Sequence, residues 1–391
     1  MEWMEQPLAE LKEQSLLRSI RPSAAIVGKA GRIVRDGREL LDLSSNDYLG
    51  LSQHASIKEA MIQSLQEEGC GAGASRLISG SRLGYEQLEA ALAQWHGTDA
   101  AVVFGSGYMC NVGTIAALAG REDALFSDRL NHASIVDGAV LSRAEHIRYK
   151  HNDLDHLESL LKKHGSARRR WIVTDAIFSM DGDAAPLREL VELKYRYNAG
   201  LIVDEAHSGG VYGAEGQGLA AELGLSGHID VHIGTFSKSF GVYGAYAAGS
   251  HTLRSWLVNK ARPLIYSTAL PPSVIAGVQR ALLLIRQERQ RADAVRGHAR
   301  LFRETFTRAG LQVTGQPDCP VVPVMTGDAE SAIRLSEELL LAGIAASAIR
   351  TPTVPANASR VRFSLSSAHS GQELQEALSA VMNITSRMGM R

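Results

Sequence analysis

The chain has 391 residues, of which 45% are hydrophobic and 21% charged, a composition typical of globular proteins with a large core. With 41 basic and 42 acidic residues, its formal net charge is −1, which argues against a nucleic-acid partner or a membrane-binding surface. Its widely spaced cysteines offer neither a disulfide framework nor a zinc-binding pattern. Because the start lacks the apolar core of a signal peptide and no apolar run reaches about 18 residues, we expect a cytoplasmic protein.

The first part of the chain, residues 1–44, is predicted to form a helix and a short hairpin. Two helices follow over 56–69 and 85–97, because apolar residues recur there at helical spacing. Further along, short apolar runs alternate with helical stretches as far as the "AYAAGS" run at 245–250. Alternation of strands and helices, with continuously apolar strands, predicts a mostly parallel sheet covered by helices on both faces.

The character of the sequence changes after a long helical stretch near 272–309, where short strands alternate with two helices. We therefore predict three parts: an N-terminal segment over 1–44, a large α/β domain over 45–280 and a small C-terminal α+β domain over 281–391. In open α/β sheets, ligands bind beyond the carboxyl ends of the strands. Polar residues at those ends are therefore the first candidates for a functional site.

A glycine-rich turn at Gly107 and Tyr108 joins one predicted strand to a helix. Free backbone N–H groups at a helix start, with the helix dipole behind them, favour a phosphate group. A plain tight turn explains the same residues nearly as well. The turn does not fit the G-x-G-x-x-G motif because Cys110 replaces the last glycine, and the chain has no P-loop motif. These absences argue against a dinucleotide or a P-loop site.

Three further strand ends carry reactive side chains. Asp204 and His207 follow one apolar strand, Ser179 follows another, and Lys238 follows a third with Thr235 three residues before it. A buried carboxylate is costly unless it meets a cation, and a lysine amine can form a Schiff base with an aldehyde. This pairing is typical of a pyridoxal phosphate (PLP) site, in which an aspartate keeps the pyridine nitrogen protonated. Taken alone, Lys238 is better explained as a solvated lysine in a loop, and only its surroundings favour the PLP site.

Seven ordered stretches give the chain a resemblance to the α-oxoamine synthases, which are fold type I PLP enzymes. The resemblance implies a large, mostly parallel sheet domain with a smaller C-terminal α+β domain. The stretches are NDYLGL (46–51), GAGASRLISGS (71–81), LNHASIVDGA (130–139), FSMDGDAAPL (178–187), VDEAHSGGVYG (203–213), GTFSKSFG (234–241) and RTPTVPANASRVRFSLSSAHS (350–370).

The resemblance implies three catalytic residues: Lys238 as the Schiff-base lysine, Asp204 as the partner of the pyridine nitrogen, and His132 stacked on the ring. An ordinary histidine at a helix start is the alternative for His132, and a lone surface arginine after a helix is a stronger alternative for Arg21. The other contacts that it implies are Ser179 and His207 at the phenolic oxygen of PLP, Gly107, Tyr108 and Thr235 at its phosphate, Thr268 at the phosphate of a neighbouring subunit, and Arg21, Asn46, His132, Arg350 and Thr353 at the substrates.

Within the family, the NDYLGL, IYSTALPP (265–272) and TPTVP (351–355) stretches look most like the members that join L-alanine to a pimeloyl thioester, carried by CoA or by an acyl carrier protein. The resemblance also implies a homodimer. Members that use glycine or serine are the first alternative, and a PLP-binding protein without activity is the second. We expect no metal ion.

Overall fold

The computed structural model describes residues 2–390 and divides the chain into two compact units. The larger unit comprises Leu51–Phe178 and Ala184–Ala292, and the smaller one comprises the chain up to Gly50, the short stretch Ser179–Asp183 and the chain from Asp293 onward. The predicted division at residues 44 and 280 stays a prediction.

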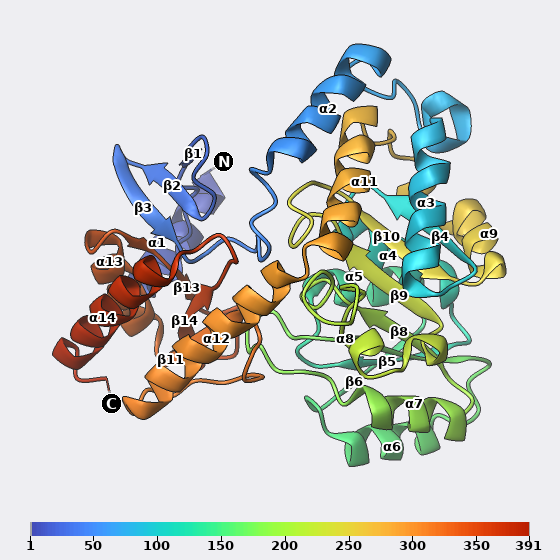
Figure 1. Cartoon of the computed structure of the whole chain (residues 1–391). Helices are drawn as coiled ribbons and strands as arrows, with labels where there is room; N and C mark the ends of the chain where they lie inside the picture. Colours follow the sequence, from blue (N-terminus) through green and yellow to red (C-terminus); the bar gives the residue numbers. More distant parts are fainter. Residues whose placement is uncertain (1, 391) are drawn as a thin grey trace. The chain divides into compact units, whose positions relative to one another are not determined.

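A seven-stranded sheet forms the centre of the larger unit (Figure 1). The five strands β6, β5, β7, β8 and β9, adjacent in that order, are parallel to one another, whereas β10 runs antiparallel between β4 and β9. The predicted mostly parallel sheet is therefore confirmed. In spatial order the strands are β4 (Ala100–Phe104), β10 (Ala245–Gly249), β9 (Val231–Thr235), β8 (Gly200–Asp204), β7 (Arg170–Asp175), β5 (Ala124–Asp128) and β6 (Glu145–Tyr149).

Helices of the larger unit lie on both sides of this sheet (Figure 1). The two helices predicted before the first strand are present as α2 and α3, whereas the π-helical turn η2 was not predicted. The helical elements are α2 (Ala55–Glu68), η2 (Arg76–Gly80), α3 (Leu83–His96), α4 (Gly107–Leu118), α5 (Ala133–Ser142), α6 (Leu154–Lys163), α7 (Leu187–Arg196), α8 (Leu219–Glu222), η3 (Ser226–His228), α9 (His251–Lys260), α10 (Arg262–Ile265) and α11 (Pro272–Gln287).

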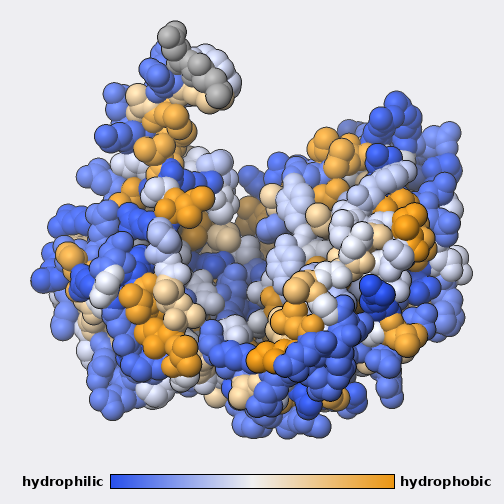
Figure 2. Space-filling model, turned by 90° about the horizontal axis from the view of Figure 1, so that it is seen from above, coloured by the Kyte–Doolittle hydropathy of each residue, from blue (hydrophilic) through white to orange (hydrophobic). Residues whose placement is uncertain are grey.

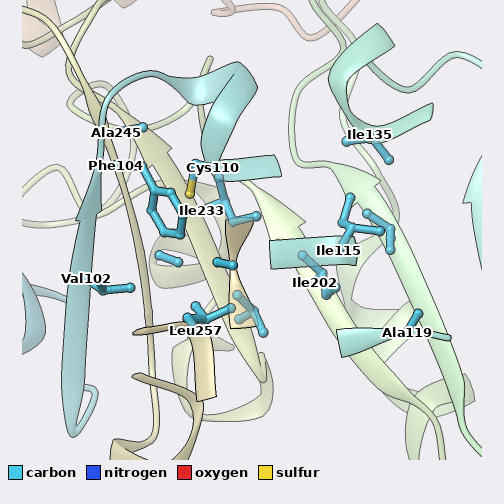
Figure 3. Packing of buried hydrophobic residues seen from close by; sticks show 14 of the residues in the cluster. Val102, Phe104, Cys110, Ile115, Ala119, Ile135, Ile202, Ile233, Ala245 and Leu257 are labelled. Atoms are coloured by element: carbon cyan, nitrogen blue, oxygen red, sulfur yellow. The ribbon is translucent and has the colours of Figure 1, made fainter. Parts of the chain in front are cut away.

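The main core of the larger unit lies where α4 packs on the sheet (Figure 3). Cys110 and Ile115 of α4 meet Phe104, Ile202 and Ile233 of the strands, and all five side chains are buried. Each large apolar side chain removed from water in this way stabilises the fold by about 1.5–3 kcal/mol. This packing holds the start of α4 against the carboxyl ends of the parallel strands.

Within residues 2–390, the smaller unit contains two small sheets and four α-helices, one of which begins just before the boundary at Asp293. Its α+β character agrees with the mixture of short strands and helices expected for the C-terminal part of the chain. The strands are β1 (Ala24–Ala25), β2 (Arg32–Arg35), β3 (Arg38–Asp42) and β12 (Ile344–Ala345) in one sheet, and β11 (Val321–Gly327), β14 (Ser359–Ser364) and β13 (Ser347–Ile349) in the other. The helical elements are η1 (Glu2–Met4), α1 (Glu5–Glu13), α12 (Gln290–Arg308), α13 (Ala329–Leu341) and α14 (Gly371–Arg387).

Groups of apolar side chains interrupt a largely hydrophilic surface in the view of Figure 2. On the larger unit, Tyr108 and Met109 at the start of α4 and Val140 and Leu141 at the end of α5 are exposed. Among residues 2–390, no helix combines the length and the apolar character that a membrane crossing requires.

Candidate active site

Asp204, the last residue of β8, is a buried carboxylate with hydrogen-bond donors around it. The Asn111 amide nitrogen donates to its Oδ2 at 2.7 Å, and the Ala206 backbone N–H donates to its Oδ1 at 2.9 Å. Within residues 2–390, no lysine or arginine forms an ion pair with it. Because a buried anion is costly without a cation, this carboxylate is suited to a cationic partner such as a protonated pyridine nitrogen.

Lys238 lies in the turn that follows β9, and its Nζ is 2.8 Å from Nε2 of His207. The turn closes where the Gly241 N–H donates to the Lys238 carbonyl at 2.8 Å. Gly241 has φ +66°, and a Cβ there would collide with the backbone of Ser52, so this position requires glycine. The structure thus brings together two predicted site residues, Lys238 and His207.

The start of α4 and the end of β9 form a second predicted grouping. The position of a Cβ built on Gly107 lies 3.6 Å from Oγ1 of Thr235, so the helix start and this hydroxyl are close to each other. Ser106 caps the helix by accepting a hydrogen bond from the Met109 N–H at 3.2 Å. Tyr108 is half-exposed and donates its hydroxyl hydrogen to Asp137. Helix start and threonine together fit a phosphate group.

His132 caps α5 and contacts the protein through its Nδ1 edge and its backbone. Nδ1 is 2.7 Å from the Ser134 hydroxyl, and the backbone N–H donates to Asp175 Oδ2 at 2.8 Å. Burial of the His132 ring lowers its pKa. The charge of Asp204 acts to raise this pKa, and the charge of Lys238 acts to lower it. Asp175 and Asp204 face each other in the β7–β8 register, so burial, together with the second carboxylate, raises the pKa of Asp175 well above its usual range.

Thr268 lies in an exposed segment that pairs with the start of η2. It forms an isolated bridge with Ser75, and the adjacent Ala269 N–H donates to the Ala74 carbonyl at 3.0 Å. None of these contacts joins Thr268 to the Lys238 group. Its predicted role at the phosphate of a neighbouring subunit stays a prediction.

In the smaller unit, the predicted residues Asn46 and Ser179 share an arginine that sequence reasoning missed. Arg362 of β14 donates to the Ser179 carbonyl at 3.0 Å and to Asn46 Oδ1 at 3.2 Å. It is only 7% exposed, its Nε has no hydrogen-bond partner, and no carboxylate within residues 2–390 pairs with it. Arg360, two residues away, does pair with Asp181. A buried guanidinium with neutral partners is suited to a carboxylate ligand.

The other three predicted substrate residues of the smaller unit, Arg21, Arg350 and Thr353, line one pocket of about 610 Å³ together with Arg18. Arg350 donates to the carbonyls of Ser15 and Leu17 at 2.8 and 2.9 Å, and Arg18 donates to Thr353 Oγ1 at 2.8 Å. Burial, followed by the charges of Arg18 and Arg21, lowers the pKa of Arg350. The pocket therefore has a positive potential that an anionic ligand would relieve.

Residues 38–381 match the family model described as aminotransferase class I and II. The chain belongs to this family. A "Putative 8-amino-7-oxononanoate synthase" of Geobacillus kaustophilus (strain HTA426) is 46% identical over 384 residues, which cover 98% of this chain and 97% of the relative. The protein of the same description from Bacillus cereus (strain B4264) is 46% identical over 380 residues, covering 96% of this chain and 95% of the relative.

Solved structures share the fold of this aminotransferase class I and II member. A serine palmitoyltransferase from S. paucimobilis with bound PLP and myriocin has a TM-score of 0.94 and 28% identity, covering 100% of this chain and 98% of that one. An 8-amino-7-oxononanoate synthase from Francisella tularensis has a TM-score of 0.78 and 28% identity, covering 90% of this chain and 99% of that one. The chain is thus a PLP-dependent α-oxoamine synthase of fold type I, as the resemblance implied.

The side chains of the larger unit fit PLP. A lysine amine, a buried carboxylate without a cation and a helix start beside a threonine match the aldehyde, the pyridine nitrogen and the phosphate of the cofactor. Within residues 2–390, no group of three or more histidine, cysteine, aspartate or glutamate residues is placed to hold a metal ion. The roles of the individual residues toward PLP stay predictions.

Proposed function

We propose that the enzyme is an 8-amino-7-oxononanoate synthase, which acts in biotin biosynthesis and joins L-alanine to a pimeloyl thioester of CoA or of an acyl carrier protein. The observation that carries this proposal is the 46% identity to relatives of that description over nearly the whole chain. The shared fold alone does not separate the alternatives, because a serine palmitoyltransferase matches it with a TM-score of 0.94, against 0.78 for the 8-amino-7-oxononanoate synthase.

The reaction breaks the Cα–H and Cα–carboxylate bonds of alanine and the C–S bond of the thioester, and it forms one bond between Cα and the acyl carbon. One proton returns to Cα, a further proton taken up from solvent completes the protonation of the thiolate, and 8-amino-7-oxononanoate, CO2 and the free thiol are released. PLP, when bound, supplies an electron sink for the pair of electrons left at Cα. The chain must therefore bind the cofactor, move the Cα proton and hold two substrates.

In this proposal, Lys238 attaches the cofactor covalently and moves the proton at Cα. Its amine lies at hydrogen-bond distance from His207, so its position is defined before substrate arrives. Asp204 holds a proton on the pyridine nitrogen, and Asn111 fixes the orientation of that carboxylate. Gly107 and Thr235 bind the phosphate.

Binding of the substrates falls to arginines of the smaller unit. We assign the carboxylate of alanine to Arg362, held by Asn46 and Ser179, in place of Arg350, whose guanidinium is already bound to two backbone carbonyls. The pocket that Arg18 and Arg21 line is suited to an anionic part of the acyl donor.

A homodimer is part of the same proposal. The exposed apolar side chains of α4 and α5, which include Met109, Val140 and Leu141, are of the kind that subunit contacts cover. These two helices pack against each other, so the apolar side chains at their ends belong to one region of the larger unit.

The decisive experiment measures product formation from pimeloyl-CoA with L-alanine, glycine and L-serine in parallel, and repeats the series with palmitoyl-CoA and acetyl-CoA. We expect kcat/KM with L-alanine and pimeloyl-CoA to exceed the values with glycine and serine by at least about tenfold. Preference for serine with palmitoyl-CoA would indicate a serine palmitoyltransferase, and preference for glycine with acetyl-CoA a 2-amino-3-ketobutyrate ligase.

A further inference from the structure

A chain of buried hydrogen bonds connects Asp204 to His132 through Asn111 of α4 and Ser134 of α5. Asn111 Nδ2 lies 2.7 Å from Asp204 Oδ2 and 2.9 Å from Ser134 Oγ, and that hydroxyl lies 2.7 Å from His132 Nδ1. Ser134 is fully buried and Asn111 is 2% exposed, so water cannot replace either group. Gly138 permits this geometry, since a Cβ there would lie 3.2 Å from the Asn111 carbonyl.

The direction of every hydrogen bond in this chain follows from its first member. A carboxylate only accepts, so Asn111 turns its amide nitrogen toward Asp204, and the second hydrogen of that nitrogen is donated to Ser134 Oγ. Ser134 therefore keeps its single hydroxyl hydrogen for His132 Nδ1. The Ser134 backbone N–H also points to Nδ1, at 3.3 Å. Nδ1 is thus surrounded by donors and acts as an acceptor.

We infer that Asn111 and Ser134 are positioning residues of the active site that hold His132 as the neutral tautomer with its ring proton on Nε2. This tautomer places an N–H donor, and no lone pair, on the edge of the ring that is turned away from Ser134. His132 then binds an acceptor and does not remove the Cα proton, which leaves that step to Lys238. The inference rests on the PLP site and is independent of which amino acid the enzyme uses.

Charged groups around His132 also affect whether its ring is neutral or protonated. Lys238 opposes a positive charge on the ring, whereas Asp204 and Asp137 favour one, and Asp175 is bound to the His132 backbone N–H. Burial outweighs the two favourable carboxylates, and the pKa of His132 is lowered. If Nδ1 were protonated, the Ser134 hydroxyl would have to accept from it and turn its own hydrogen elsewhere. That hydrogen would then compete with the one that Asn111 already donates to the same oxygen.

The test uses the holoenzyme labelled with 15N-histidine and observed by solid-state NMR across a pH series. A difference spectrum against His132→Gln identifies the two ring nitrogens of His132. We expect an unprotonated Nδ1 and a protonated Nε2 in the wild type. In Ser134→Ala, loss of a donor to the neutral ring should raise the pKa of His132 by about 0.4–1 unit. Ser142→Ala is the matched control, because Ser142 is a buried serine of the same helix that donates to the Ala139 carbonyl.

Two further variants guard against a purely structural effect. Asn111→Ala keeps the Ser134 hydroxyl but frees its direction, so a mixture of both tautomers is expected. Ser134→Thr restores the hydroxyl and should restore the wild-type spectrum. A wild-type His132 protonated on Nδ1, or a Ser134→Ala spectrum and pKa that match those of Ser142→Ala, would overturn the inference, whatever the turnover of the variants.

Discussion

The polar groups around Lys238 in the larger unit and those of the basic pocket in the smaller unit are organised differently. In the larger unit, Asp204 and His132 are each held by specific buried partners, and Lys238 is held by His207. In the smaller unit, Arg18 and Arg21 are exposed, and like charges face one another across a pocket. Groups fixed before the reaction stabilise a transition state, whereas exposed charges mainly attract a ligand and bind it loosely. The larger unit should therefore control kcat and the smaller unit KM.

The largest effect is expected for Lys238→Ala. Without this amine, no covalent link to PLP forms and no base is left at Cα, so kcat should fall by at least about 10⁴-fold. The measurement is borohydride reduction of the PLP-loaded protein followed by mass spectrometry of its peptides. Lys260→Ala on the surface helix α9 serves as the control and should retain the reducible link. Cofactor trapped on the Lys238 variant would show that another lysine does the chemistry.

Asp204→Asn should lower kcat by about 10²–10³-fold, because a neutral amide cannot hold the proton on the pyridine nitrogen. PLP binding should persist in part, since the phosphate contacts at α4 remain. Steady-state kinetics with alanine check this, alongside Asp153→Asn, in which asparagine replaces aspartate as the cap of α6. A near-normal kcat would remove Asp204 from its proposed role.

Each unit contains a buried histidine that is expected to make the folded protein less stable at acid pH. Burial lowers the pKa of His232 in the larger unit and of His369 in the smaller unit to about 4 each. The unfolded chain therefore takes up these protons first, and stability is lost as pH falls from about 6.5 to 4, by about 3 kcal/mol for each histidine.

Urea unfolding of the wild type, His232→Gln and His369→Gln at pH 7 and at pH 4.5 tests this expectation. The loss between the two pH values should be smaller in each variant than in the wild type, although both variants begin less stable at pH 7. Equal losses in all three proteins would mean that other groups govern acid unfolding. A difference confined to one variant would mean that only the histidine replaced in that variant contributes to acid unfolding.

Arg362→Gln should raise KM for alanine by about 10–100-fold with a smaller change in kcat, because a charge-assisted pair with the substrate carboxylate is lost. Arg38→Gln, at an exposed arginine of the same unit that donates to the Leu341 carbonyl, is the control. If Arg350→Gln raised KM for alanine and Arg362→Gln did not, the role first expected for Arg350 would be restored.

Sequence reasoning succeeded where the signal is local. Apolar runs alternating with helices predicted the parallel sheet, which is confirmed. Polar residues at strand ends pointed to Asp204 and Lys238, which lie at the end of β8 and just after the end of β9, whereas their roles stay predictions. Arg362 was missed because the sequence around it is typical of a strand whose charged side chains alternate with apolar ones and face solvent. Only the packing of the folded chain shows that this arginine is buried without an acidic partner. The partners of Arg350 lie 333 and 335 residues away in the chain, a contact that no local pattern encodes.

The smallest effect is expected for Arg18→Gln, at the basic pocket. Arg18 is exposed and has a neutral partner, Thr353, so its charge attracts an anionic ligand only weakly, because solvent screens the attraction. Losing it should raise KM for pimeloyl-CoA by about two- to tenfold at low salt, leave KM for alanine unchanged, and matter less at high ionic strength because salt screens the pocket. Lys29→Gln, another exposed cation of the smaller unit, which pairs with Glu39, should change neither KM. A fall in kcat in place of a rise in KM would contradict the assignment of kcat to the larger unit and KM to the smaller one, since it would show that this exposed pocket also acts in the chemical step.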